Sequence, residues 1–316
     1  MEDNYNRNPS DNLDGEIDLR EFFSVLWQGK YIIFLSITFL SLIGVVYSLY
    51  LPNIYKSEAL LNPVNTSNAI SKSLQNYAGL AGLAGVSFPS TSNESNSPKA
   101  IKKLSSLSFF ENKVLPNIFL PDLMAIKSWD PMSNTLNYEK NIYNSDLNLW
   151  VRDYSYPFSQ TPSAQESFMV FKKNNLNISE DKNTGFVTLS MKHQSPFIAK
   201  QWIEIMVDQV NAFYRQKDKS ESEKAINYLN KKILIANISE VKEAIAQILE
   251  EETKKLTLIE ANEYYVFEYI DPPAVMEKKS EPKRVLICIF FALLGGFMGI
   301  VYVSIKHYIF IKRHDK

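Results

Sequence analysis

Two long apolar segments constrain the fold of this chain more than any other feature. Neither Tyr31–Leu51 nor Val285–Ile305 contains a charged residue. A helix needs about 20 apolar residues to cross the hydrocarbon core of a bilayer. A buried helix of a soluble protein rarely stays apolar on every face over that length. The two segments therefore predict two transmembrane helices.

A cleaved signal peptide is the alternative for the first segment. The apolar stretch begins only at Tyr31, and it is longer than the apolar region of a signal peptide, which has about 7–15 residues. No Ala-x-Ala cleavage pattern follows it, and the chain continues directly into strand-like sequence at Tyr55. We therefore expect an uncleaved membrane anchor.

Two spans place both termini on one side of the membrane and residues 52–284 on the other. Positive charges near the spans do not decide the orientation, and long domains are translocated largely regardless of them. The termini are expected to lie inside, with these basic residues close to the spans: Arg20, Lys30, Lys306, Lys312, Arg313 and Lys316. The expected order is a tail at 1–30, a span at 31–51, a domain at 52–284, a span at 285–305 and a tail at 306–316.

Composition argues against an enzyme and against nucleic-acid binding. The net charge is −1, so no basic field is present to attract a polyanion. The single cysteine, Cys288, excludes a disulfide framework and a cysteine-rich zinc site. The three histidines (His193, His307 and His314) are far apart in sequence, and no Ser/His/Asp or Cys/His set is recognisable. We expect no catalytic residue, no metal and no cofactor.

The central region alternates strand-like and helical sequence. Strands are expected at Tyr55–Leu61 and Tyr264–Ile270, and a hairpin is expected around a turn at Asp181–Gly185. A helix is expected from Ser97 to about Val114, because apolar residues recur there at helical spacing. This order predicts an α+β domain with a mixed sheet near the membrane.

The stretch that follows the hairpin is unusually long and helical. Ser195-Pro196 is a typical helix start, and no glycine or proline occurs from Phe197 to Asp271. An unbroken helix over about 196–262 would be roughly 100 Å long and would project from the domain. Its narrow, shifting apolar stripe suggests packing against another helix or subunit. A helical hairpin, with a bend in the polar run 215–224, is the alternative.

Three evenly spaced glycines, Gly79, Gly82 and Gly85, occur in the stretch YAGLAGLAGVS. The spacing does not fit G-x-x-x-x-G-K-[ST] or G-x-G-x-x-G, and no lysine follows at the required place. The intervening residues are leucine and alanine, which do not suit a phosphate site. We expect a small-residue segment that packs closely, at a subunit contact or within the domain.

Small residues also mark the second span, and prolines precede it. Gly295 and Gly299 form G-x-x-x-G, and Ala292 and Gly296 lie beside them. This pattern lets transmembrane helices approach closely, although glycine is common in membrane helices in any case. Three prolines precede the span and are expected to stiffen the connection into the membrane: Pro272, Pro273 and Pro282.

Several ordered strings resemble one family, the Wzz-type chain-length determinants, which are polysaccharide co-polymerases without a kinase domain. The strings are EIDLREFFSVLWQGKYII, LPNIYKSEALLNP, LAGLAGVS, LPDLMAIKSWD, TGFVTLSMKHQSP, KAINYLNKKI and VFEYIDPP followed by EPKRVLI. Each string is modest alone, but together they extend the resemblance over nearly the full chain.

The resemblance implies a two-pass protein of the bacterial inner membrane with its α/β domain in the periplasm and both tails in the cytoplasm. It implies a homo-oligomer, commonly an octameric ring, that acts with a Wzy-type polymerase on an undecaprenyl-linked glycan. The function implied is non-enzymatic control of O-antigen chain length in lipopolysaccharide biosynthesis. An adaptor for capsule, exopolysaccharide or enterobacterial-common-antigen-like assembly and export is the alternative. A periplasmic sensor is less suitable, because tails as short as 1–30 and 306–316 cannot form an output module.

Overall fold

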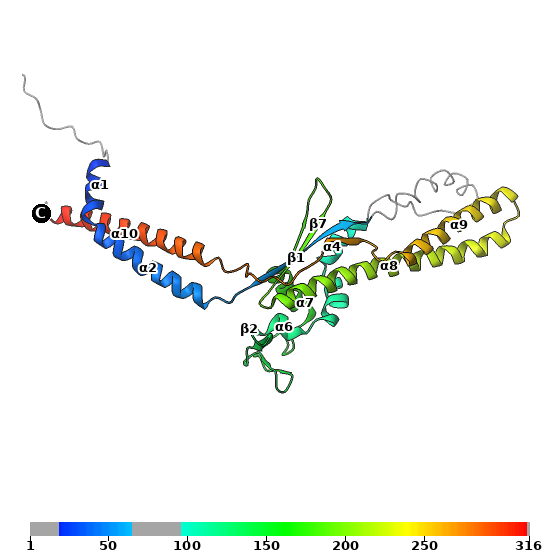
Figure 1. Cartoon of the computed structure of the whole chain (residues 1–316), viewed down its shortest axis with the longest axis horizontal. Coiled ribbons are helices and arrows are strands. Elements are labelled where there is room, and N and C mark those ends of the chain that lie inside the picture. The colour runs from blue at the N-terminus through cyan, green and yellow to red at the C-terminus, as the bar shows by residue number, and fades with distance from the viewer. Residues whose placement is uncertain (1–18, 65–95, 315–316) are drawn as a thin grey trace, which may run out of the picture. The chain divides into compact units, whose positions relative to one another are not determined.

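The computed structural model describes residues 19–64 and 96–314 (Figure 1). The chain divides into two compact units. One unit combines Met1–Pro52 with Glu281–Lys316, and the other consists of Asn53–Ser280. Gly79, Gly82 and Gly85 lie outside the described residues. The expected α+β fold with two apolar helices near its ends is confirmed.

The described residues of the first unit form the helices α1 (Leu19–Gln28), α2 (Lys30–Tyr50) and α10 (Arg284–His314). Helices α2 and α10 pack along each other. Both are long and apolar enough to cross a membrane, over Lys30–Tyr50 and Arg284–His307. Only 11% of the most apolar window of each is buried, so most of their apolar surface faces outward, as lipid contact requires. Helix α1 lies within the segment expected to be a tail, and α10 continues beyond Ile305.

The second unit is built on a four-stranded sheet in the order β6-β7-β1-β8. The strands are β1 (Tyr55–Pro63), β6 (Leu176–Glu180), β7 (Val187–His193) and β8 (Phe267–Asp271). The sheet was expected to be mixed, but every described pair in it is antiparallel. The connections explain this, because β6 and β7 form a tight hairpin, and both β7 and β8 run opposite to β1 on its two sides.

The hairpin between β6 and β7 agrees with the sequence prediction. Asp181 Oδ1 accepts a hydrogen bond of 2.9 Å from the Asn183 N–H, which is the typical Asx-turn bond. Gly185 has φ of +74°, a left-handed conformation that glycine adopts without a steric cost. These residues form the turn through local interactions, and the antiparallel pairing of β6 with β7 extends from the turn to the pair Leu176–Met191.

The inner half of α8 (Pro196–Ile235) packs across this sheet and forms most of the core. Strand residues alternate, so that Ala59, Leu61 and Leu189 face the helix from one side of the sheet. The α8 side chains that are buried against the sheet recur at helical spacing. They are Trp202, Ile203, Met206, Val207 and Val210.

The continuous helix over 196–262 is wrong, and the alternative, a helical hairpin, is confirmed, although its turn lies at 236–238 and not within 215–224. Helix α8 runs unbroken through 215–224 and ends at Ile235, and α9 (Ser239–Ala261) returns beside it (Figure 1). A helix unbroken to residue 262 would carry the chain roughly 100 Å from its start. It could not then deliver β8 to its place next to β1. No glycine or proline marks residues 236–238. Asn237, whose short side chain competes for backbone hydrogen bonds, is the only local signal.

The expected helix from Ser97 to Val114 is also interrupted. Helix α4 (Asn96–Leu104) ends before Ser106, α5 (Leu107–Phe109) follows, and a π-helical turn η1 (Phe110–Val114) completes the segment. The Ser106 hydroxyl donates to the Lys103 carbonyl at 2.7 Å and accepts from the Phe109 N–H at 3.3 Å. With these two hydrogen bonds, the Ser106 side chain ends helix α4 and caps helix α5.

Residues 115–175 form short elements beside the sheet. They are η2 (Leu115–Asn117), α6 (Leu120–Met124), β2 (Ile126–Asp130), β3 (Thr135–Tyr138), β4 (Tyr143–Asn144), β5 (Leu149–Trp150), α7 (Ala164–Val170) and the π-helical η3 (Phe171–Asn175). Phe110, Phe168, Phe171 and Trp202 contact one another as ring pairs and join this layer to the main core.

Candidate functional site

The pair α2–α10 is held by the close approach of two backbones. A Cβ atom placed on Gly295 would lie 2.9 Å from Ile37 Cα, and one placed on Gly299 would lie 2.9 Å from Ile33 Cα. Ordinary Cβ atoms do not approach backbone this closely, so these two positions require glycine. Gly296 has space, because its nearest neighbour is an Ile37 side-chain carbon at 3.7 Å. Ala292 is half-buried on the same helix.

Two further features of this pair were missed by the sequence analysis. Ser36 Oγ donates a hydrogen bond of 2.9 Å to the Gly295 carbonyl. A Cβ on Gly44 would lie 2.8 Å from Phe291 Cβ, so α2 also contributes a glycine at which α10 approaches closely. Gly44 is the one glycine in the sequence Tyr31–Leu51, and this could have indicated a close contact with the second span. Small residues and a side-chain-to-backbone bond are the usual means by which membrane helices associate.

The outer half of α8 and α9 form a helical hairpin with its own apolar seam. Leu229, Ile245 and Ile248 are buried between the two helices. Around them lie four half-buried apolar residues: Ile233, Ala236, Val241 and Leu249. The apolar stripe that shifts along residues 226–248 of the sequence is therefore two stripes, one on α8 and one on α9, which face each other. Glu250 and Lys254 form an exposed pair at 2.5 Å on the outer surface.

A buried asparagine fixes the root of this hairpin to the sheet. Asn211 Nδ2 donates to the Phe267 carbonyl at 2.9 Å, and its Oδ1 accepts from the Val266 and Phe267 N–H groups at 2.8 and 2.9 Å. The Tyr265 hydroxyl donates to Asp218 Oδ2 at 2.5 Å, and burial together with this carboxylate raises the pKa of Tyr265. These bonds set the point at which α8 leaves the sheet, and sequence spacing gave no sign of them.

His193 is a structural residue, because both of its ring nitrogens are engaged. The Ser195 N–H donates to Nδ1 at 2.9 Å, so Nε2 carries the proton and donates to the Asp122 carbonyl at 2.9 Å. Burial against Trp202 lowers the pKa of His193, which favours the neutral ring. The side chain of Asp122 accepts a bond of 2.6 Å from the Tyr138 hydroxyl, and burial raises the pKa of Asp122.

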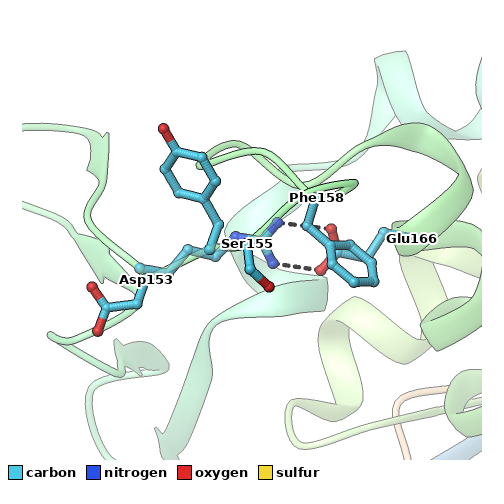
Figure 2. A pocket seen from close by; sticks show the side chains of 6 residues that line it. Asp153, Ser155, Phe158 and Glu166 are labelled. Atoms are coloured by element: carbon cyan, nitrogen blue, oxygen red, sulfur yellow. Dashed lines mark hydrogen bonds and ion pairs between the residues drawn. The ribbon is translucent and has the colours of Figure 1, made fainter.

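An arginine shapes the loop between β5 and α7. Arg152 Nε donates to the Gln160 carbonyl at 2.9 Å, and Nη2 donates to the Ser159 carbonyl and to Glu166 Oε2, both at 2.7 Å. Nη1 donates to the other Glu166 oxygen, so that the pair is bidentate (Figure 2). The hydrogen bond from Arg152 lowers the pKa of Glu166. A shallow pocket of about 400 Å³ lies here, lined by Arg152, Asp153, Tyr154, Ser155, Phe158 and Glu166.

The prolines expected to lead into the second span follow β8. Pro273 is buried and Pro272 is exposed. Nearby, the Ser57 hydroxyl donates to the Ala274 carbonyl at 2.8 Å, and the Ser280 N–H donates to the Ile54 carbonyl at 2.8 Å. The segment after β8 is therefore bonded along the start of β1. Pro282 belongs to the other unit and is half-buried.

Across the described ranges 19–64 and 96–314, no group of three or more His, Cys, Asp or Glu side chains could hold a metal ion. His193 and Glu166, whose pKa values are both lowered, serve structural contacts.

Comparison with known proteins finds one matching family model. Residues 15–112 match the Wzz family, described as chain length determinant protein. No curated protein matches the chain.

Among solved structures, the chain is similar to a full-length bacterial polysaccharide co-polymerase, at 14% identity and a TM-score of 0.41, with 92% of this chain and 98% of that chain covered. It is also similar to a fragment of WzzB, a polysaccharide co-polymerase from Salmonella Typhimurium, at 14% identity and a TM-score of 0.32. This match covers 72% of this chain and 100% of that chain. A third similar structure is that of a mutant of the Shigella flexneri lipopolysaccharide O-antigen chain-length regulator WzzB, at 12% identity and a TM-score of 0.24. This match covers 72% of this chain and 100% of that chain. At these TM-scores the likeness is distant.

Proposed function

We propose a function for this chain from the premise that it carries a Wzz chain length determinant domain at residues 15–112. The protein regulates the length of a bacterial polysaccharide without catalysing a reaction itself. Its polymer is the O-antigen of lipopolysaccharide, and it acts as a co-polymerase beside a Wzy-type polymerase that elongates an undecaprenyl-linked glycan. The family match is the observation that carries this proposal.

The location that suits this function is the bacterial inner membrane, with α2 and α10 as its two spans and Asn53–Ser280 in the periplasm. The tails then lie in the cytoplasm, next to the basic residues at the ends of the spans. Alkaline phosphatase fused after Met276 is expected to be active, and the same enzyme fused after Lys316 is expected to be inactive. The reverse pattern would contradict this orientation.

The assembly that suits this function is a ring of identical subunits, with eight as the expected number. The projecting α8–α9 hairpin supplies a long surface for neighbouring copies, and the segment with Gly79, Gly82 and Gly85 is proposed as a further subunit contact. Electron cryo-microscopy of the full chain in nanodiscs would count the subunits directly, and a monomer would contradict the proposal.

Deletion of the gene tests the proposed function most directly. In a strain that makes O-antigen, the modal cluster of chain lengths on a lipopolysaccharide gel should be lost, and the wild-type gene should restore it. An unchanged ladder of lengths would refute the O-antigen role. If capsule or exported polysaccharide changed instead, the protein would be an adaptor for that polymer, and an export channel encoded nearby would agree with this outcome.

A substitution in the second span tests whether the helix pair takes part in this function. Gly295→Leu combined with Gly299→Leu should shift the chain-length distribution, because leucine cannot fit against the backbone of α2. A wild-type distribution, with the variant present in the membrane at normal level, would count against a role for these glycines.

A further inference from the structure

We propose that the loop after β5, residues 151–163, forms a binding site for an uncharged segment of the glycan whose length the protein regulates. This inference rests on the proposed function for the identity of the ligand. The site itself is the pocket lined by Arg152, Asp153, Tyr154, Ser155, Phe158 and Glu166 (Figure 2).

The loop presents aromatic side chains to solvent. Tyr154 is 60% exposed, Phe158 is 54% exposed, and Tyr156 between them is 97% exposed. These rings are not part of the core of the second unit. An exposed aromatic ring offers a flat apolar face, and the C–H face of a pyranose ring is a flat apolar surface of similar size. Clustered exposed aromatic rings are typical of recognition surfaces.

Polar groups beside these rings are available to a ligand. Within the described part of the chain, the side chains of Asp153, Tyr154 and Ser155 form no hydrogen bond or ion pair. Figure 2 shows Asp153 and Glu166 at opposite ends of the group of labelled side chains, with Ser155 between them. A carboxylate and two hydroxyls around an aromatic wall can accept from and donate to the hydroxyl groups of a sugar.

Charge favours a neutral ligand. The cation of the pocket, Arg152, is already bonded to both oxygens of Glu166 and to the Ser159 and Gln160 carbonyls. Asp153 remains as the uncompensated charge among the lining residues, and no lysine occurs in residues 145–166. An anionic lipid surface or a phosphate group would be repelled, since binding of either needs unpaired basic residues.

The loop is also held in place before a ligand binds. Arg152 bridges two loop carbonyls to α7, and the Ser163 hydroxyl accepts from the Glu166 N–H at 3.2 Å at the start of that helix. Pro162 is buried. A loop fixed in this way loses little conformational entropy on binding, which favours affinity from a small contact area. The loop has the rigidity, the aromatic rings and the hydrogen-bonding groups that a sugar site needs.

The test measures binding of the full-length protein in nanodiscs to one probe, the polysaccharide released by mild acid from the lipopolysaccharide of the host strain. Isothermal titration should detect binding, and polygalacturonate should not bind. Tyr154→Ala combined with Phe158→Ala should weaken binding about tenfold or more. Tyr228→Ala, which removes an aromatic ring of similar exposure on α8, should leave binding unchanged.

A second pair of variants identifies the chemistry at Asp153. Asp153→Ala should weaken binding, whereas Asp153→Asn should retain most of it, because an amide still forms hydrogen bonds with sugar hydroxyls. Circular dichroism melts of all variants control for folding, since each altered side chain is exposed.

The outcomes separate this site from the proposed function. If gene deletion shifts chain lengths but the pure protein binds no glycan, or the double variant binds as well as wild type, the site is refuted and the function stands. Loop variants that shift chain lengths without any glycan binding would assign the loop to a protein partner and also refute the site. If deletion leaves the ladder unchanged while binding still depends on Tyr154 and Phe158, the site stands and the O-antigen role fails.

Discussion

The described part of the chain includes two antiparallel helix pairs that are held together in different ways. In α2–α10, glycines bring backbone against backbone, and Ser36 donates to the Gly295 carbonyl. In α8–α9, Leu229, Ile245 and Ile248 fill the seam, and charged residues cover the outer surface. The apolar residues of the first pair face outward, as Phe34, Leu42 and Leu293 illustrate, whereas those of the second pair face inward.

The solvent explains the difference. In water, burial of a leucine or isoleucine side chain between helices is favourable by about 1.5–3 kcal/mol, so a short seam of large residues is sufficient. Lipid tails are as apolar as leucine, and association in a membrane therefore depends on close packing and polar contacts. Each pair has the interface chemistry that its surroundings require.

The largest expected effect on stability comes from truncating a buried side chain between α8 and α9. Ile245→Ala should destabilise the α8–α9 hairpin by about 3 kcal/mol, because it leaves a cavity between two helices. Hydrogen exchange of the amides in α9 should accelerate accordingly. Leu234→Ala is the matched control, since Leu234 is 83% exposed and its loss should change little. Equal exchange in both variants would show that this seam does not hold the hairpin.

The next effect comes from adding atoms to the membrane pair. Gly295→Ala combined with Gly299→Ala should destabilise α2–α10 by about 1–3 kcal/mol, because both new methyl groups meet the backbone of α2. Thermal unfolding in detergent, followed by far-ultraviolet circular dichroism, would report it. Gly296→Ala should be tolerated, since its methyl group meets only a side chain at 3.7 Å. A double variant as stable as Gly296→Ala would contradict the close packing.

Acid should destabilise the second unit, and the effect should be smaller than that of either substitution. Because burial lowers the pKa of His193, the unfolded chain binds a proton more readily than the folded chain below about pH 6.5. Stability is therefore complete at neutral pH and falls as the pH decreases from about 6.5. The lowered pKa of Glu166 adds a loss in the same direction at more acidic pH.

His193→Gln isolates the histidine contribution, because glutamine can still donate to the Asp122 carbonyl but does not titrate. Chemical denaturation of the variant between pH 7 and pH 5 should show a flatter dependence of stability on pH than the wild-type protein. An identical dependence would assign the acid sensitivity to the carboxylates instead.

The smallest effect is expected at an exposed ion pair of the hairpin root. Lys219 Nζ lies 2.7 Å from Glu260 Oε1, which joins α8 to α9. Both side chains are solvent-accessible, so water and salt screen the attraction. Lys219→Ala should leave unfolding almost unchanged at physiological salt. A loss as large as that of Ile245→Ala would mean that charge, rather than the apolar seam, holds the hairpin.

Local chemistry in the sequence predicted several elements correctly. The apolar length of the two spans, the Ser195-Pro196 start of α8 and the turn at Asp181–Gly185 depend on neighbouring residues alone, and all three occur in the structure. These features are encoded over a few turns of chain, which is the range within which side-chain pattern and backbone preference act together.

Tertiary structure decided what those patterns left open. The hairpin bends at 236–238, where no strong breaker occurs, because β8 must return to pair with β1 and because two apolar stripes fit each other. The bonds of Asn211 and of Arg152 join residues far apart in the sequence or within an irregular loop, where no periodicity reveals them. The sequence alone determined which segments are apolar and helical. Only the fold determined where they turn, which glycines meet a backbone and which polar groups remain open to a ligand, because each of these depends on contacts between distant parts of the chain.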